Sequence, residues 1–270
     1  MPENKIPEHL NYTDTGEPQL PILFFIHGWP DTGELWKRQE THFAGRYRCV
    51  CITLPAFDPK DSSRGPDFPE LLDRIISTIS RVRPDSNVPL ILVGHDWGAY
   101  LTYLLDQQHP EISSRLITMD VGGHFRPASL AHALFMLSYQ WWLIAAYFFG
   151  KLVPSAGNAM NRLISVPAHA PRGSDVVARS NYLYFYFWRA RFCKKYRRGL
   201  LQHYRISKPL LYLFGEKKTY HFHSSRWLKW VAEAPGSKAV GLKDCGHWLM
   251  LRDPEVTNQT IDAWLKEEII

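Results

Sequence analysis

The sequence has few cysteines and no apolar run near its N-terminus. Only four of the 270 residues are cysteine, and the spacing of Cys49, Cys51, Cys193 and Cys245 fits no metal site. The first nine residues are polar and mixed in charge, so they lack the apolar segment of a secretory signal. We therefore expect a cytoplasmic protein with reduced cysteines in its core and with neither a metal nor a cofactor.

The sequence also lacks a nucleic-acid-binding module, although its formal net charge is +6. Six basic residues fall within the single stretch Arg189–Arg198, so much of the excess is local. A basic, aromatic-rich segment can contact an anionic membrane surface weakly. A solvated helix face is the favoured interpretation, and we expect no nucleic-acid partner.

Apolar residues are abundant, at 45% of the chain with 14% aromatics, which is enough for one large core. Short apolar runs bounded by turn residues alternate with longer amphipathic stretches, and this pattern predicts an α/β protein with a mostly parallel sheet covered by helices. The expected strands are Leu20–Ile26, Arg48–Leu54, Pro89–Val93, Leu116–Met119, Pro209–Phe214 and Ser237–Leu242, with a weaker one at His9–Thr13.

Three helices are indicated by apolar stripes and end signals. Leu72, Ile75 and Ile79 belong to one stripe of the stretch Pro69–Val82. Another helix is expected at Gly98–Gln108, and a last one from Asp253 to about Lys266, where aspartate precedes a proline at the first helical position.

The alternation stops between residues 122 and 204, where the sequence is helical in composition and rich in aromatics. We interpret this segment as a helical lid inserted into a core made of residues 1–121 and 205–270. Its apolar run Ala133–Val153 is near the length of a transmembrane helix. Polar residues at 138–140 interrupt the run, so a lid helix over an apolar pocket is favoured.

The motif Gly94-His95-Asp96-Trp97-Gly98 lies between an apolar strand and a helix pattern. This is the context of a nucleophile elbow, in which glycines let strand and helix approach around a strained central residue. Asp96 is therefore the candidate nucleophile. The alternative is an aspartate that merely caps the following helix.

A second strand ends in the motif His27-Gly28-Trp29-Pro30. Ligands of open α/β sheets bind at the carboxyl ends of the strands. The backbone N–H groups of Trp29 and Trp97 can converge there as an oxyanion hole. We expect His27 to be structural, bonding the loop.

His247 follows the last predicted strand, in Asp244-Cys-Gly-His-Trp248, and is the candidate general base. Its value as a candidate lies in its order in the chain, because the candidate nucleophile, the lid and this histidine each come after a strand. His221 and His223 have no third ligand at a fitting spacing, and we expect them to be loop residues.

These motifs resemble those of the epoxide hydrolases and haloalkane dehalogenases of the α/β-hydrolase superfamily, nearly throughout the chain from Leu20. The resemblance implies an aspartate nucleophile and leans toward epoxide hydrolysis of a small apolar substrate. The chemistry agrees, because attack of a carboxylate on a saturated carbon gives an alkyl ester that water can hydrolyse. A serine there would form a stable ether.

The resembling family uses two lid tyrosines as the acid that protonates the opened epoxide. Tyr139 is our first choice. For the second, we prefer Tyr186 over Tyr182 and Tyr184, because Tyr186 lies nearest the next core strand.

The chain departs from the family at the acid that would orient the histidine. Lys218 stands where an acidic residue is common, and a cation there opposes formation of an imidazolium. Asp120, after the preceding core strand, can substitute, with Glu216 as a less favoured choice. Two alternatives to an epoxide hydrolase therefore stay open, namely a haloalkane dehalogenase and a non-catalytic ligand-binding or scaffold protein on the same fold.

Overall fold

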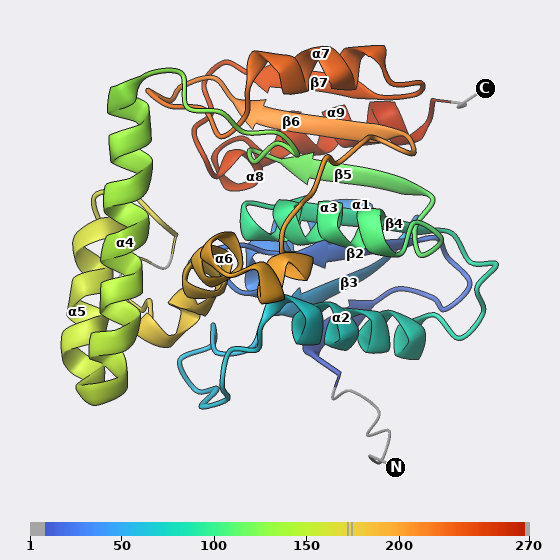
Figure 1. Ribbon diagram of the computed structural model, residues 1–270. Coiled ribbons are helices and arrows are strands. Elements are labelled where there is room, and N and C mark those ends of the chain that lie inside the picture. The colour runs from blue at the N-terminus through green and yellow to red at the C-terminus, as the bar shows by residue number, and fades with distance from the viewer. Residues whose placement is uncertain (1–8, 172, 174, 268–270) are drawn as a thin grey trace.

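Within residues 9–171, 173 and 175–267, which this computed structural model describes, the chain forms a seven-stranded sheet of order β1-β3-β2-β4-β5-β6-β7 (Figure 1). β1 is antiparallel to β3, and all other neighbours are parallel. The α/β class and the mostly parallel sheet are confirmed. The strands are β1 (Asn11–Thr15), β2 (Ile22–Ile26), β3 (Arg48–Thr53), β4 (Leu90–His95), β5 (Arg115–Met119), β6 (Leu210–Gly215) and β7 (Lys238–Leu242).

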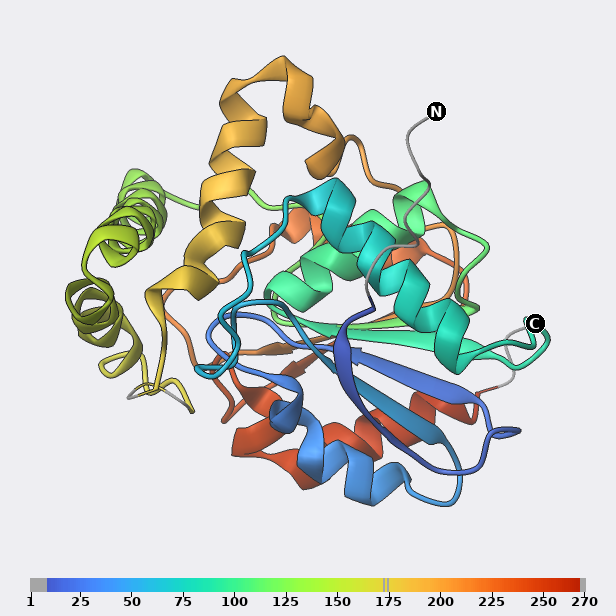
Figure 2. The same cartoon turned by 90° about the horizontal axis from the view of Figure 1, so that it is seen from below.

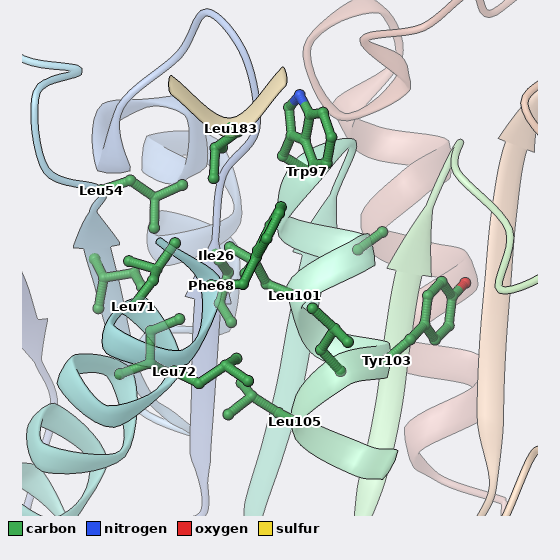
Figure 3. Close-up of a cluster of buried hydrophobic side chains, with 14 of the residues drawn as sticks. Ile26, Leu54, Phe68, Leu71, Leu72, Trp97, Leu101, Tyr103, Leu105 and Leu183 are labelled. Carbon is green, nitrogen blue, oxygen red and sulfur yellow. The ribbon is translucent and has the colours of Figure 1, made fainter. Parts of the chain in front are cut away.

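Helices cover both faces of the sheet, because successive residues of the buried strands point to opposite sides. In β2, Phe24 and Ile26 face one core, whereas Leu23 and Phe25 face the other. Figure 3 shows the first core, in which Phe68, Leu72 and Leu101 pack between helices and sheet. That face is covered by α2 (Phe68–Val82), α3 (Trp97–Gln108) and α7 (Ser225–Glu233), and the opposite face by α1 (Lys37–Phe43), α8 (Leu249–Arg252) and α9 (Pro254–Leu265).

Aspartates cap two helix starts, of which only Asp253 was expected from the sequence. In α2 the Asp67 side chain accepts a hydrogen bond from the Glu70 N–H at 3.4 Å, and in α9 Asp253 accepts one from the Val256 N–H at 3.1 Å. Each aspartate thereby satisfies a backbone donor that the helix leaves free.

A helical segment lies between β5 and β6, and we call residues 122–204 the helical insertion. It contains α4 (Leu130–Leu152), α5 (Pro154–Ser165), α6 (Tyr182–Phe192) and two short 3₁₀ helices, Ala178–Asn181 and Lys194–Gly199. The strand arrowheads of Figure 1 point toward it, so it lies at the carboxyl ends of the strands. In Figure 2, α4 and α5 stand away from the sheet with α6 between them and the core.

The apolar run expected at Ala133–Val153 belongs to α4, which packs against α5 and α6. By length and composition α4 is apolar enough to cross a membrane. Only 22% of its most apolar window is buried, so one side of the helix remains open to the surroundings.

Candidate active site

Asp96 occupies the sharp turn between β4 and α3. Its backbone has φ 53° and ψ −118°, a strained conformation for a residue with a side chain. The flanking glycines allow the turn, because a Cβ on Gly98 would lie 2.0 Å from the Ile26 carbonyl oxygen and one on Gly94 would lie 2.4 Å from the Gly98 oxygen. The local structure thus has the geometry of the predicted elbow.

Two backbone donors converge on the Asp96 carboxylate. The Trp29 N–H donates to Oδ2 at 2.8 Å, and the Trp97 N–H also hydrogen-bonds this carboxylate. The Trp29–Pro30 peptide bond is cis. A Cβ on Gly28 would lie 2.5 Å from Oδ2, so glycine is required for the loop to approach the carboxylate this closely.

His247 lies on the loop after β7 and bridges two carboxylates. Its Nε2 is 3.8 Å from Asp96 Oδ1, and its Nδ1 makes a short hydrogen bond to Asp120 Oδ2. With Nδ1–H donating to Asp120, the Nε2 lone pair faces Asp96. Phe222 packs against the ring, with centroids 5.5 Å apart.

Asp120, after β5, is the buried acid beside His247, and Lys218 binds the same carboxylate. The Lys218 Nζ lies 2.5 Å from Asp120 Oδ1 and 2.6 Å from Oδ2. Burial acts to raise the pKa of Asp120, but the charges of Lys218 and His247 outweigh burial and hold it far below its ordinary value. Asp120 therefore stays ionised. Glu216 is exposed, with its side chain against Gly241.

Burial raises the pKa of the Asp96 carboxyl, while His247 and the N–H groups of Trp97 and Trp29 oppose the shift. A carboxylate that is incompletely solvated is a stronger nucleophile than one in bulk water. The donors hold the Asp96 carboxylate in one orientation, with burial opposing its charge.

Sequence reasoning did not single out His95, which contacts the loop and the ring of His247. The His95 Nε2–H donates to the His247 carbonyl oxygen at 3.0 Å, and the two rings lie 4.5 Å apart. Burial holds the pKa of His95 well below its ordinary value, so its ring is neutral. The sequence signal that could have identified His95 is its position directly before Asp96, the candidate nucleophile.

Asp96 lies in a cavity of about 800 Å³ between the sheet edge and the helical insertion. Residues of the helical insertion form much of its wall, among them three residues each of α4 and α6. The lining includes Trp97, Tyr100, Met136, Tyr139, Gln140, Tyr184, Phe187, Arg191, Phe222 and Trp230.

Tyr139 lines this cavity, but Tyr186 does not, so the preference for Tyr186 over Tyr184 was wrong in position. Tyr184 lies in the cavity, with Phe187 and Arg191 on the same helix face at spacings of three and seven. Two residues along a helix turn the side chain by about 200°. Tyr186 consequently faces Arg189, whose guanidinium lies 4.3 Å from the ring centroid.

The other candidate histidines have structural contacts. His27 Nε2 accepts a hydrogen bond from the Leu54 N–H at 2.9 Å, and its Nδ1 lies 2.8 Å from the Gly28 oxygen. His223 Nδ1 hydrogen-bonds the Tyr212 hydroxyl. Across the part of the chain that the structure describes, no group of three or more His, Cys, Asp or Glu side chains is arranged so that it could hold a metal ion.

The comparison with protein families agrees with this geometry. The model of the alpha/beta hydrolase family matches residues 23–260, which includes the elbow, the insertion and His247. The chain belongs to the alpha/beta hydrolase family.

Curated relatives of this alpha/beta hydrolase include several epoxide hydrolases. Epoxide hydrolase 1 of Caenorhabditis elegans is 33% identical over 122 residues, which cover 43% of this chain and 30% of the relative. Epoxide hydrolase 4 of Mus musculus is 22% identical, over 96% of this chain and 76% of the relative. The protein is thus a hydrolase similar to epoxide hydrolases.

Solved alpha/beta hydrolases share the fold at low identity. An epoxide hydrolase of Bacillus megaterium in complex with an inhibitor has a TM-score of 0.65 at 18% identity, covering 96% of this chain and 97% of its own. A marine microorganism esterase has a TM-score of 0.68 at 14% identity, covering 95% of this chain and 99% of its own. The structures of an esterase and of an epoxide hydrolase match this fold about equally well. The fold therefore does not identify the reaction, which depends on the side chains of the site.

Proposed function

We propose that this hydrolase opens an apolar epoxide by nucleophilic attack of Asp96 and then hydrolyses the resulting ester to a diol. The observation that carries the proposal is a carboxylate at the elbow with one oxygen held by the Trp29 backbone N–H and the other beside His247. This arrangement fits a substrate with a saturated electrophilic carbon. Attack on a carboxylic ester would instead give an anhydride.

In the first step, Asp96 Oδ1 forms a bond to a ring carbon and the carbon–oxygen bond of the epoxide breaks. One of the hydroxyls of Tyr139 and Tyr184 would give its proton to the departing oxygen, and the other would donate a hydrogen bond to that oxygen. The Tyr139 hydroxyl accepts from the Gln140 Nε2–H at 3.3 Å, and the Tyr184 hydroxyl accepts from the Trp97 side chain. Each hydroxyl keeps its own hydrogen for the substrate.

The state of both hydroxyls supports this role. Burial raises the pKa of Tyr139 and of Tyr184 well above the ordinary value, and the Asp96 charge adds to the shift in each case. Both are therefore neutral hydrogen-bond donors near neutral pH, and both lie within the field of the nucleophile.

In the second step, His247 Nε2 takes a proton from water, and the water oxygen attacks the ester carbonyl carbon of Asp96. The charge that develops on Oδ2 is stabilised by the N–H groups of Trp29 and Trp97. The bond from that carbon to Oδ1 then breaks, and the diol leaves with Oδ1, which takes the proton of the new carboxyl group and so restores the carboxylate. The proton held by His247 returns to the tyrosine that protonated the epoxide oxygen, and the site is reset. Asp120 stabilises the imidazolium formed in between.

A haloalkane dehalogenase is less well supported, because halide binding needs free N–H donors. The Trp29 indole N–H already donates to Asn181 Oδ1 at 2.8 Å, and the Trp97 side chain hydrogen-bonds Tyr184. The non-catalytic alternative depended on Lys218 in place of an acid. Asp120 supplies the acid that hydrogen-bonds His247, and Lys218 binds this same carboxylate. A lysine at position 218 is therefore compatible with catalysis.

We further propose that the helical insertion acts as a lid. Its residues Tyr139, Tyr184 and Phe187 lie over Asp96, and the aromatic wall suits a small apolar substrate. A lid that limits access of water favours attack by the enzyme carboxylate over direct hydrolysis.

Mass spectrometry of the intact His247→Gln variant tests the mechanism. After exposure to aromatic and fatty epoxides and to matched alkyl halides, we expect an epoxide adduct that peptide mapping places on Asp96. The variant should be alkylated but not turn over, because the ester forms without a base that activates water.

The double variant Asp96→Asn, His247→Gln is the matched control and should stay unmodified. An adduct formed only by the halides would replace the epoxide hydrolase with a dehalogenase. Unmodified His247→Gln with every reagent, in a protein that is folded by circular dichroism, would contradict nucleophilic catalysis by Asp96.

A further inference from the structure

The outer face of α4 is apolar and exposed along its whole length. Leu134, Trp141, Phe148 and Leu152 recur at spacings of seven, seven and four residues, which places them in one stripe of the helix. Leu152 is 82% exposed and Leu134 57%. Surfaces of this kind on soluble domains mark contact sites. The exposed apolar residues of α4 are Leu130, Leu134, Phe135, Leu137, Trp141, Trp142, Phe148, Phe149 and Leu152.

This face continues onto the end of α6. The Trp141 ring lies 5.6 Å from Trp188 and 6.3 Å from Phe192, and Trp188 stacks on Phe192 at 5.3 Å. Phe192 is 70% exposed. It is followed within three residues by the exposed Lys194 and Lys195. We call the exposed apolar residues of α4, together with Phe192, Lys194 and Lys195, the insertion surface.

The charged residues of the insertion are almost all basic. Its sequence holds eleven Lys and Arg against a single acid, Asp175. Because the whole chain has a net charge of +6, the sequence outside residues 122–204 has a net charge of −4. The positive charge of the protein is thus concentrated in the segment that carries the exposed apolar face.

We infer that the insertion surface docks on a membrane rich in anionic lipids, with α4 lying along the interface. An apolar stripe with Trp and Phe suits the boundary between headgroups and acyl chains, and flanking lysines are attracted to anionic headgroups. Lys151, near the other end of α4, lies 4.2 Å from the Tyr147 ring centroid and adds a cation there. A second copy is the poorer occupant, because two insertions of high positive charge repel each other.

The same elements connect this surface to the cavity. Met136 and Tyr139 of α4 and Arg191 and Arg197 of the basic stretch line the cavity that contains Asp96. Docking would therefore bring the cavity wall to the lipid boundary, where apolar compounds accumulate. Arg189 has a different role, since it forms an ion pair with Asp67 at 2.9 Å.

Vesicle co-sedimentation of the full chain tests the inference, and turnover is not needed for it. We expect binding to vesicles of phosphatidylcholine with about 30% phosphatidylserine and much weaker binding to phosphatidylcholine alone. The paired changes Lys194→Glu with Lys195→Glu should weaken partitioning by about tenfold or more, and about 0.5 M NaCl should do the same by screening.

The apolar half of the surface has its own variant, Phe149→Gln with Leu152→Gln, which should also weaken binding at least about fivefold. Val256→Gln on α9 is the matched apolar control, and Lys243→Glu with Lys266→Glu is the matched charge control. Both controls should bind like the original chain, since all of these residues are exposed on the core.

Three results would overturn the inference. The first is absence of binding to anionic vesicles at low salt. The second is an equal loss of binding in the control charge pair, which would mean that net charge rather than the insertion surface is responsible. The third is a lipid-free dimer that the Phe149→Gln, Leu152→Gln pair dissociates, because a second copy would then cover the face.

Discussion

The carboxyl end of the sheet and the outer face of the insertion differ in what they bury. Charged groups are buried at the sheet edge, whereas apolar side chains are exposed on the insertion. At the sheet edge Asp120 is fully buried, and it accepts hydrogen bonds from His247, Lys218 and the Gly215 N–H. On the insertion, Leu152 is 82% exposed, and Lys194 and Lys195, which follow Phe192, are exposed too, in a segment with almost no acids.

The difference follows from what each region has to do. Buried charges at the sheet edge are costly, and fixed donors and acceptors of this kind would stabilise the charge that develops in the proposed reaction. Exposed apolar side chains contribute little to folding, so their persistence on one helix face points to an interaction outside the chain.

Asp120→Asn tests the sheet edge and should have the largest effect. Asparagine cannot hold His247 in the same tautomer or balance its charge, so hydrolysis of the Asp96 ester should slow by about 10²- to 10⁴-fold. Alkylation should change only a few-fold, because Asp120 does not contact Asp96. Single-turnover kinetics followed by mass spectrometry separate the two steps.

Asp106→Asn is the matched control, since Asp106 is another buried aspartate with a lysine partner, Lys208, at 2.9 Å. The rates of alkylation and of ester hydrolysis in Asp106→Asn should each stay within a few-fold of those of the original chain. An unchanged hydrolysis rate in Asp120→Asn would make Asp120 a structural residue.

The next effect concerns the tyrosines over the cavity. Tyr184→Phe and Tyr139→Phe should each lower the rate of epoxide opening by about 10²-fold, because a general acid is lost while the ring is kept. Tyr186→Phe should stay within about twofold, as its ring faces Arg189. Rates of adduct formation in the His247→Gln background measure this directly. A larger loss in Tyr186→Phe than in Tyr184→Phe would reverse the assignment.

Lys218→Met measures the stabilisation of the buried carboxylate. The depressed pKa of Asp120 contributes stability that is complete above its unfolded value and is lost as the pH falls toward the folded value. The variant should therefore lose roughly 1–3 kcal/mol of unfolding free energy at neutral pH, and the deficit should shrink below about pH 4. Urea unfolding between pH 3 and pH 7 gives this profile; a deficit that grows at low pH would contradict it.

The smallest effect is expected on the outer face of α4. Leu152→Gln should change the unfolding free energy by no more than about 0.5 kcal/mol. Leu143→Ala, on the buried side of the same helix, should cost about 2–5 kcal/mol through lost packing. Thermal unfolding of both variants provides the measurement. A large loss in Leu152→Gln would mean that this face is needed for folding.

Much of the fold was predictable, because the signals are local. The apolar runs of β2 and β4 need burial on both sides, and glycines around Asp96 fit only a tight turn. The boundaries shifted by one to a few residues, as for β4, which continues to His95. The sequence did not show where the helix at 182–192 begins or which of its sides faces the cavity. Tyr184 and Tyr186 therefore could not be told apart.

The sequence by itself determined the sheet, the elbow with Asp96, and His247 as a histidine after the last strand, since each depends on residues within a few positions of one another. Only the tertiary structure decided which acid meets His247, which tyrosine faces Asp96, and what Lys218 does. Asp120 is 127 residues from His247 and 98 from Lys218, and their meeting depends on how β5 and β6 place their ends side by side. No local pattern encodes that contact, because the packing of the whole sheet produces it.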